Sequence, residues 1–162
     1  MQFYYSYDKL GDLSDDAVIC FTTEIKDVKG SYLKTLDAAT DGGLSQLVSS
    51  EEFTGKDSET ASFTRPVELA TKRLLIVGLG DAKKLNADSF RKAMGELSRY
   101  RGFSQAKSVA LYFGNYSEAA YFQAAVEGYL LGSFKQREYK TGKGARDDAR
   151  LSSFRVSVAK PA

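Results

Sequence analysis

The sequence contains no histidine and no tryptophan, and it has only one cysteine and two prolines. The absence of histidine removes the commonest general base and a common zinc ligand. A single cysteine, Cys20, cannot form an internal disulfide, which is typical of a reducing compartment. No apolar run approaches the ~20 residues that span a bilayer, and the first residues lack the basic and apolar regions of a signal peptide. We therefore expect a cytoplasmic protein with no membrane partner.

The composition that remains is that of an ordinary globular protein. The 162 residues are 43% apolar and 27% charged, with a formal net charge of +2. A chain of this length can bury a core without disulfides or metals. Its near balance of charge does not by itself indicate nucleic acid or a membrane surface. We expect a single domain over residues 1–159.

Apolar, β-branched segments alternate with segments of helical periodicity along the chain. Strands are expected at residues 3–7, 17–25, 74–77, 109–113 and 154–158, and helices at 33–48, 87–101 and 119–132. Gly42 and Gly43 argue against one unbroken first helix, and Asn86 is the expected cap of the second. The last strand alternates apolar and polar residues, as a half-exposed edge strand does. This order predicts an α/β fold in three layers, a mixed, mainly parallel sheet flanked by helices.

A glycine turn, Gly78-Leu79-Gly80, directly follows the most apolar strand. Such a turn is typical of a dinucleotide-binding loop, whose backbone NH groups hold a pyrophosphate. However, the third glycine of that motif would fall at Lys83, and a lysine there opposes close packing of helix on strand. The following helix also begins too late to direct its N-terminus at a phosphate. The pattern favours a structural chain reversal.

The segment 119–132 is predicted to be a helix buried almost all round, because it is apolar on every side. Its alanines and glycines permit close approach of backbones, although each glycine costs up to about 1 kcal/mol of helix propensity. Glu127 lies in the middle of this helix. It is either a buried acid or base with a raised pKa or a carboxylate bonded to backbone or to a nearby arginine. We favour the bonded carboxylate, since no nucleophile or histidine accompanies it.

The other candidate groups have ordinary structural interpretations. Cys20 lies in an apolar strand and is expected to be a small core residue. The carboxylate pairs, at Asp15-Asp16, Glu51-Glu52 and Asp147-Asp148, fall in turns or the tail and are expected to be solvated. A basic stretch is formed by Lys135, Arg137, Lys140, Lys143, Arg146, Arg150 and Arg155. Interspersed acids favour a solvated linker over a phosphate-binding patch. We therefore predict no catalytic, cofactor-binding or metal-binding residue in this chain.

Several short motifs occur in an order that resembles a known family. They are Leu36-Asp37, Gly42-Gly43-Leu44, the Phe-Thr-Gly-Lys of 53–56, Glu59-Thr60, the Leu-Ile-Val-Gly-Leu-Gly of 75–80, the Glu-Gly-Tyr-Leu-Leu-Gly of 127–132, and Phe134 with Tyr139-Lys140. Over residues 17–140 this pattern resembles the N-terminal domain of the leucyl (cytosol) aminopeptidases, peptidase family M17. The resemblance implies a macro-like fold. It also implies a hexameric parent enzyme that uses two divalent metals, zinc or manganese, to remove N-terminal residues from peptides.

The resemblance does not extend to the family's catalytic motifs. In that family the metal ligands, lysine and acidic residues, belong to a C-terminal catalytic domain, whose Asn-Thr-Asp-Ala-Glu-Gly-Arg signature is absent here. The Thr-Gly-Lys-Gly of 141–144 is similar to the family's metal-lysine segment, but the rest of that motif does not follow, and we interpret Lys143 as a coincidence. Asp57-Ser58 departs from the family pattern before its glutamate. Residues 141–152 are expected to form a basic loop before the final strand.

The resemblance implies a non-catalytic domain of a metallo-exopeptidase. Its expected partners are its own C-terminal catalytic domain and further copies of the chain, and its expected roles are oligomer contacts or access to the catalytic domain. Two alternatives stay open. A macro-like sheet could bind ADP-ribose or another nucleotide, with residues 78–83 near the phosphates. Some relatives bind DNA, to which residues 135–155 could contribute.

Overall fold

The computed structural model describes residues 2–100, 106–138 and 153–157. Six strands form one sheet, and four α-helices and two short 3₁₀ turns connect them. The strands are β1 (Gln2–Ser6), β2 (Ala17–Thr22), β3 (Thr60–Thr64), β4 (Arg73–Gly78), β5 (Ser108–Tyr112) and β6 (Ser153–Ser157). The helices are α1 (Ser31–Ala39), α2 (Gly43–Ser49), α3 (Ala87–Leu97) and α4 (Ala119–Glu138), with the 3₁₀ turns η1 (Leu10–Asp12) and η2 (Ala82–Lys84).

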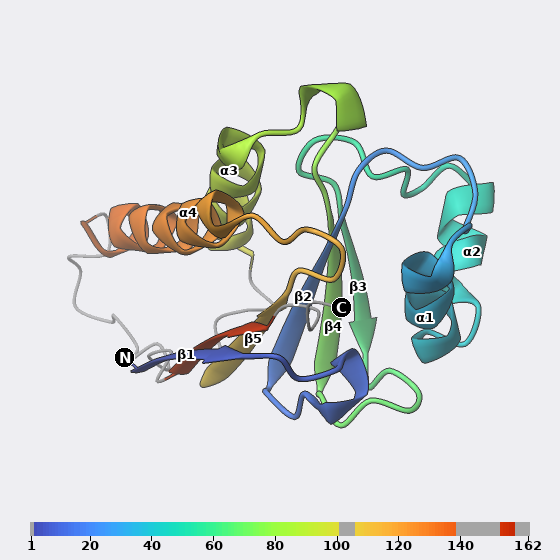
Figure 1. Ribbon diagram of the computed structural model, residues 1–162, viewed down its shortest axis with the longest axis horizontal. Helices are drawn as coiled ribbons and strands as arrows, with labels where there is room; N and C mark the ends of the chain where they lie inside the picture. The colour runs from blue at the N-terminus through green and yellow to red at the C-terminus, as the bar shows by residue number, and fades with distance from the viewer. Residues whose placement is uncertain (1, 101–105, 139–152, 158–162) are drawn as a thin grey trace.

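The sheet has the strand order β1-β6-β5-β2-β4-β3, and only β3 runs antiparallel to its neighbour. Helices α3 and α4 lie on one face, and α1 and α2 lie on the other (Figure 1). The predicted three-layer, mainly parallel α/β fold is therefore confirmed.

The central strands are apolar on both faces because helices cover both. On β2, Ile19 and Phe21 face the core beneath α3 and α4, whereas Val18 and Cys20 face the core beneath α1 and α2. All four side chains are fully buried. This explains why β2 and β4 appear in the sequence as continuous apolar runs rather than as alternating ones.

Local signals account for where the helices begin and end. The Asn86 side chain accepts a hydrogen bond from the Ser89 NH, so the predicted cap of α3 is confirmed. The helix ends at Leu97, earlier than the predicted residue 101. Gly42, in the left-handed region at φ 76°, separates α1 from α2, so the predicted break is confirmed.

Two expectations about the later elements are wrong. The final strand, β6, is not an edge strand, because it pairs with β5 on one side and β1 on the other. Its alternation has another cause: Phe154, on one face, is fully buried in the core, whereas Arg155, on the other face, is partly exposed and lies beside Asp8 and Asp15. Helix α4 is not buried all round either, since Leu130 and Leu131 are 38% and 61% exposed.

The predicted close approach through small residues is confirmed at the contact between α3 and α4. A Cβ atom on Gly128 would lie 2.1 Å from the Arg91 carbonyl oxygen, and one on Gly132 would lie 2.5 Å from the Gly95 carbonyl oxygen. No side chain fits in that space. The two helices therefore touch backbone to backbone along this line, and α3 together with α4 forms one layer over β5, β2 and β4.

Candidate functional site

The carboxyl end of β2 is the position at which this type of sheet has its ligand crevice. In open α/β sheets ligands bind where neighbouring strands send the chain to opposite faces. Here β2 leads to α1 on one face, whereas its neighbours β4 and β5 lead to α3 and α4 on the other (Figure 1). A ligand site of this fold type is therefore expected at the carboxyl end of β2.

The turn at Gly78-Leu79-Gly80 lies at this crevice, and its three backbone NH groups are all used within the protein. They donate to the carbonyl oxygens of Glu59, Thr22 and Gly55, at 2.8, 2.8 and 3.0 Å respectively. A phosphate loop needs such donors free to face the anion. A Cβ on Gly78 would also lie 2.1 Å from the Lys56 carbonyl oxygen, so glycine is required here for loop packing. The interpretation of this segment as a chain reversal is confirmed.

The loop that packs on this turn is held together by one carboxylate. Glu59 Oε2 accepts hydrogen bonds from the NH groups of Thr54 and Lys56, at 2.9 and 3.2 Å. Partial burial acts to raise the pKa of Glu59, but these hydrogen bonds outweigh it, and the pKa lies below the ordinary value of 4.5. The motif of residues 53–60 therefore serves the conformation of this loop.

Two tyrosines cross the crevice from opposite sides. The Tyr32 hydroxyl, from α1, donates to the Phe21 carbonyl oxygen at 3.1 Å, and the Tyr116 hydroxyl, from the β5–α4 connection, accepts from the Thr23 NH at 3.2 Å. Burial raises the pKa of both phenols, so they stay neutral. A Cβ on Gly114 would lie 2.5 Å from the Tyr32 ring. The protein's own side chains thus occupy the space where this fold type takes ligands.

Glu127, the candidate buried acid, is part of a surface ion pair. Arg91 Nη2 donates to Glu127 Oε2 at 2.9 Å, and Gln123 Nε2 donates to Oε1 at 2.8 Å. The Glu127 side chain is 38% exposed. The hydrogen bond from Gln123 and then the one from Arg91 lower the pKa of Glu127. The hypothesis of a raised pKa is therefore wrong, and the interpretation as a carboxylate bonded to a nearby arginine is confirmed.

Cys20 and the Glu51-Glu52 pair match their structural interpretations. Cys20 is fully buried among apolar side chains, and burial raises the pKa of its thiol to about 12. It is therefore a core residue and not an activated nucleophile. Glu51 and Glu52 are exposed, as expected. The Asp147-Asp148 pair, Lys143 and most of the basic stretch fall in 139–152, outside the described residues.

The expectation of solvated charges at Asp15-Asp16 is wrong. The Asp15 side chain is only 6% exposed and lies 3.2 Å from Arg155 Nε. Asp16 accepts hydrogen bonds from Lys72 Nζ at 2.6 Å and from the Lys107 NH at 2.9 Å. These two bonds, the lysine ammonium first, lower the pKa of Asp16. Arg155 is likewise a paired residue and not part of a solvated linker.

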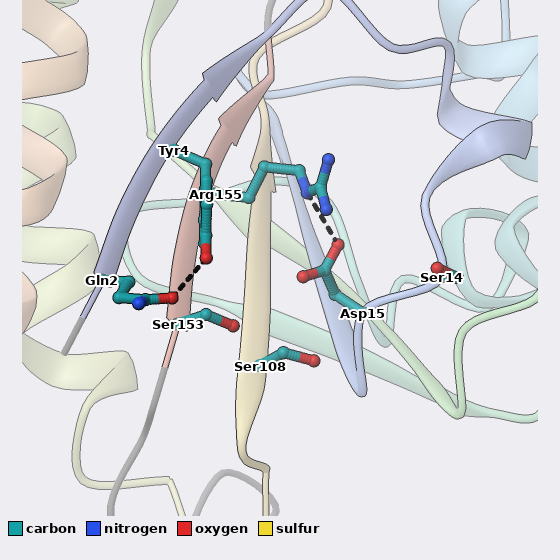
Figure 2. Close-up of a pocket in the computed structure, with 7 residues that line it drawn as sticks. All are labelled: Gln2, Tyr4, Ser14, Asp15, Ser108, Ser153 and Arg155. Atoms are coloured by element: carbon teal, nitrogen blue, oxygen red, sulfur yellow. Dashed lines mark hydrogen bonds and ion pairs between the residues drawn. The ribbon is translucent and has the colours of Figure 1, made fainter.

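Asp15 and Arg155 belong to a polar pocket of about 700 Å³ at the amino ends of the strands. It lies beside β1, β6 and β5, with Ser14 and Asp15 from the segment before β2 on its other side (Figure 2). The lining residues are Gln2, Tyr4, Ser14, Asp15, Ser108, Ser153 and Arg155. Sequence analysis missed this pocket because its residues come from both ends of the chain. The alternation of apolar and polar residues along β6 was the one pattern in the sequence that indicated a polar face at this position.

The charges in this pocket are already matched to one another. Arg155 Nη1 donates to Asp8 Oδ2 at 3.0 Å, and its Nε lies beside Asp15 Oδ2 without hydrogen-bond alignment. The guanidinium also lies 6.0 Å from the centre of the Tyr4 ring. Two carboxylates flank one arginine, which leaves no excess positive charge for an anion. No histidine accompanies the serines of the pocket, and the carboxylate in its lining, Asp15, is paired with Arg155.

Within the described residues no group of three or more His, Cys, Asp or Glu side chains could hold a metal ion. The same residues include no helix long and apolar enough to cross a membrane. Fold and site thus define a three-layer α/β domain in which the protein's own groups fill the position of the ligand crevice.

Comparison with known proteins places this domain in a family. Residues 17–143 match the model described as the cytosol aminopeptidase family, N-terminal domain. A probable cytosol aminopeptidase of Geotalea uraniireducens is 37% identical over 123 residues, which cover 74% of this chain and 25% of that protein. The corresponding protein of Solibacter usitatus is 35% identical over 120 residues, 74% of this chain and 24% of its own. The chain belongs to the cytosol aminopeptidase family, of which it is the N-terminal domain, and it spans about a quarter of these relatives.

Solved structures show the same fold. A tomato leucine aminopeptidase mutant superimposes with a TM-score of 0.71 at 18% identity, over 99% of this chain and 32% of that one. The macrodomain of Thermus aquaticus DarG superimposes with a TM-score of 0.63 at 9% identity, over 99% of both chains. Both likenesses concern architecture, and they confirm the expected macro-like fold.

Proposed function

We propose that this domain is the non-catalytic N-terminal part of an aminopeptidase that removes N-terminal residues from peptides. In that enzyme it makes oligomer contacts or shapes access to the catalytic domain. Two divalent metals, zinc or manganese, would be held by the catalytic domain, since the described residues of this chain offer no ligand cluster. The family name and the single buried thiol favour a cytoplasmic location.

The observation that carries this proposal is the filled crevice at the end of β2. The hydroxyls of Tyr32 and Tyr116 bond to the backbone of Phe21 and Thr23, and the NH groups of the turn at Gly78 donate to carbonyl oxygens of the protein. These bonds leave few polar groups at this position for a substrate or a water molecule, which supports a non-catalytic role. The chemistry of the family would then come from another part of the enzyme.

A chimeric enzyme tests the role directly. The N-terminal quarter of the Geotalea relative is deleted or replaced by this chain, and hydrolysis of leucyl p-nitroanilide is measured with manganese. We expect the chimera to recover activity or assembly that the truncated enzyme lacks. A chimera that folds but behaves as the truncated enzyme does would contradict the proposal, and the intact relative serves as the control.

The alternative that this domain binds ADP-ribose or another nucleotide is supported only by the fold, because macrodomains are among the structural neighbours. The filled crevice argues against it in this chain. The DNA alternative rests on residues 135–155, most of which lie outside the described residues. Its described member within the final strand, Arg155, is neutralised by Asp8 and Asp15 and is not available for a phosphate.

A further inference from the structure

The outer edge of β1 has the features of a strand-pairing surface. Among the described residues β1 pairs with β6 alone, and it lies at the edge of the sheet (Figure 1). The strand carries large exposed side chains: Phe3, Tyr4 and Tyr5 are 54%, 47% and 56% exposed. Natural edge strands are usually protected by charged residues, proline or bulges. The sequence of β1 has no charge and no proline.

The exposed aromatic rings are held in place by the rest of the domain. Phe3 packs on Phe154 with ring centres 6.1 Å apart, and Tyr5 lies 6.2 Å from Phe122 of α4. Tyr4 faces the other way, beneath the Arg155 guanidinium. A partner strand would therefore meet a preorganised surface, which lowers the entropic cost of association.

We propose that β1 pairs antiparallel with β1 of a second copy of this chain, about a two-fold axis at Tyr4. In this register Phe3 lies opposite Tyr5 of the partner copy and Gln2 lies opposite Ser6. Directly opposed residues share a face of the sheet, so aromatic residues meet aromatic residues and polar residues meet polar ones. The α4 faces of the two copies then form one continuous layer. Such an interface is self-complementary, as two-fold symmetry requires.

Charge favours a second copy as the occupant. Like charges directly opposite one another destabilise a strand pair, and none of the five β1 residues is charged. The other sheet edge is less suited to pairing, because the exposed side chains of β3 are Ser62 and Thr64. This inference requires only residues of the described chain, so it stands or falls independently of the proposed function.

The size of the surface predicts a weak dimer. An aromatic side chain buries about 150–250 Å² when fully covered, and those of β1 are about half exposed. Pairing would then bury at most roughly 200–400 Å² of aromatic surface per copy, below the about 800 Å² of a standard interface. We expect a dissociation constant on the order of 0.1 mM.

Sedimentation equilibrium of the 162-residue chain from about 10 μM to about 1 mM tests this inference. We expect reversible monomer–dimer behaviour. Two double variants test the register. In Phe3→Lys/Tyr5→Lys each lysine opposes a lysine of the other copy, and dimerisation is lost. In Phe3→Lys/Tyr5→Glu each lysine opposes a glutamate, and we expect dimerisation weaker than in the wild type but measurably stronger than in the double-lysine variant.

The controls separate pairing from folding. Both double variants remove the same two aromatic rings and differ only in one charge sign. Val67→Lys, at an exposed apolar residue outside β1, is expected to dimerise as the wild type does. Thermal unfolding confirms that each variant is folded. A wild-type chain that stays monomeric at about 1 mM, or two folded double variants with the same dissociation constant, would overturn the proposal.

Discussion

Glycines and short polar side chains set the geometry of the crevice. Gly78 permits the 53–59 loop to pack against the end of β4, and Gly114 leaves space for the Tyr32 ring. Glu59 holds that loop through two backbone NH groups. None of these residues has a geometry suited to catalysis. Their shared effect is to close the end of the sheet with the protein's own atoms.

At this scale Glu59 gives a pH-dependent prediction. Its pKa in the folded protein is lower than 4.5, so its stabilising effect is present above the unfolded pKa and is lost as pH falls through the folded pKa. Urea unfolding of Glu59→Gln should show a loss of about 1 kcal/mol at neutral pH, since it removes a charged hydrogen-bond acceptor that is partly screened by solvent. The difference from wild type should shrink as the pH falls below 4.5.

The exposed Glu52 provides the matched control for this measurement. Glu52→Gln removes the same charge from the same loop region without touching the Thr54 or Lys56 NH groups. We expect it to leave the free energy of unfolding unchanged at both pH values. An equal loss for Glu59→Gln at neutral and acidic pH would mean that the carboxylate charge is not what holds the loop.

Among the elements, the pair of helices α3 and α4 is the most constrained. Their backbones touch at Gly128 and Gly132, and beside the first of these contacts the Arg91 side chain pairs with Glu127. This contact explains why α4 tolerates glycines in its interior. It also explains why Glu127 could be mistaken in the sequence for a buried acid: its neighbours on α4 are apolar, but its partner is on α3.

Gly128→Ala is predicted to destabilise the domain by about 1–3 kcal/mol in urea unfolding. The new Cβ would lie 2.1 Å from the Arg91 carbonyl oxygen, a backbone atom that moves only if the helices separate. Gly95→Ala is the control at the same contact, because its Cβ would lie at an ordinary 3.5 Å from the Gly128 carbonyl oxygen. It should gain up to about 1 kcal/mol of helix propensity. Equal stability of the two variants would refute the backbone contact.

The sequence predicted elements wherever the signal is local. Asn86, Gly42 and the apolar run of β4 indicated a helix start, a helix break and a buried strand, and all three are confirmed. What it could not show depends on residues far apart in the chain. Phe3 aligns with Phe154 in the strand pair that moves β6 away from the edge, and Asp15 is buried against Arg155. The pattern of apolar and polar residues within one segment does not indicate which distant segment it will contact.

At the scale of the whole molecule, the two ends of the sheet differ in how far the protein's own groups fill them. The carboxyl end of the sheet is filled by tyrosines and glycine turns, whereas the amino end holds a polar pocket, and the exposed aromatic side chains of β1 lie along the side of the sheet. We therefore expect that the macrodomain-like architecture does not bring macrodomain-like ligand binding with it in this chain.

Calorimetric titration with ADP-ribose tests the filled crevice. The ligand would have to displace Tyr32 and Tyr116 and break their hydrogen bonds to the ends of β2. We expect no saturable heat at about 1 mM ligand, a concentration that detects even weak binding. A macrodomain titrated in the same buffer provides the positive control. Saturable one-to-one binding by this chain would show that the crevice opens.

The central claim is that this domain has the family's N-terminal fold and no active site of its own. The most direct measurement is hydrolysis of leucyl p-nitroanilide by the purified chain with manganese or zinc, beside the intact Geotalea relative. We predict that the relative hydrolyses the substrate and that the chain does not exceed the rate of metal and buffer alone. Turnover that saturates with substrate and rises in proportion to the concentration of the chain would contradict the claim.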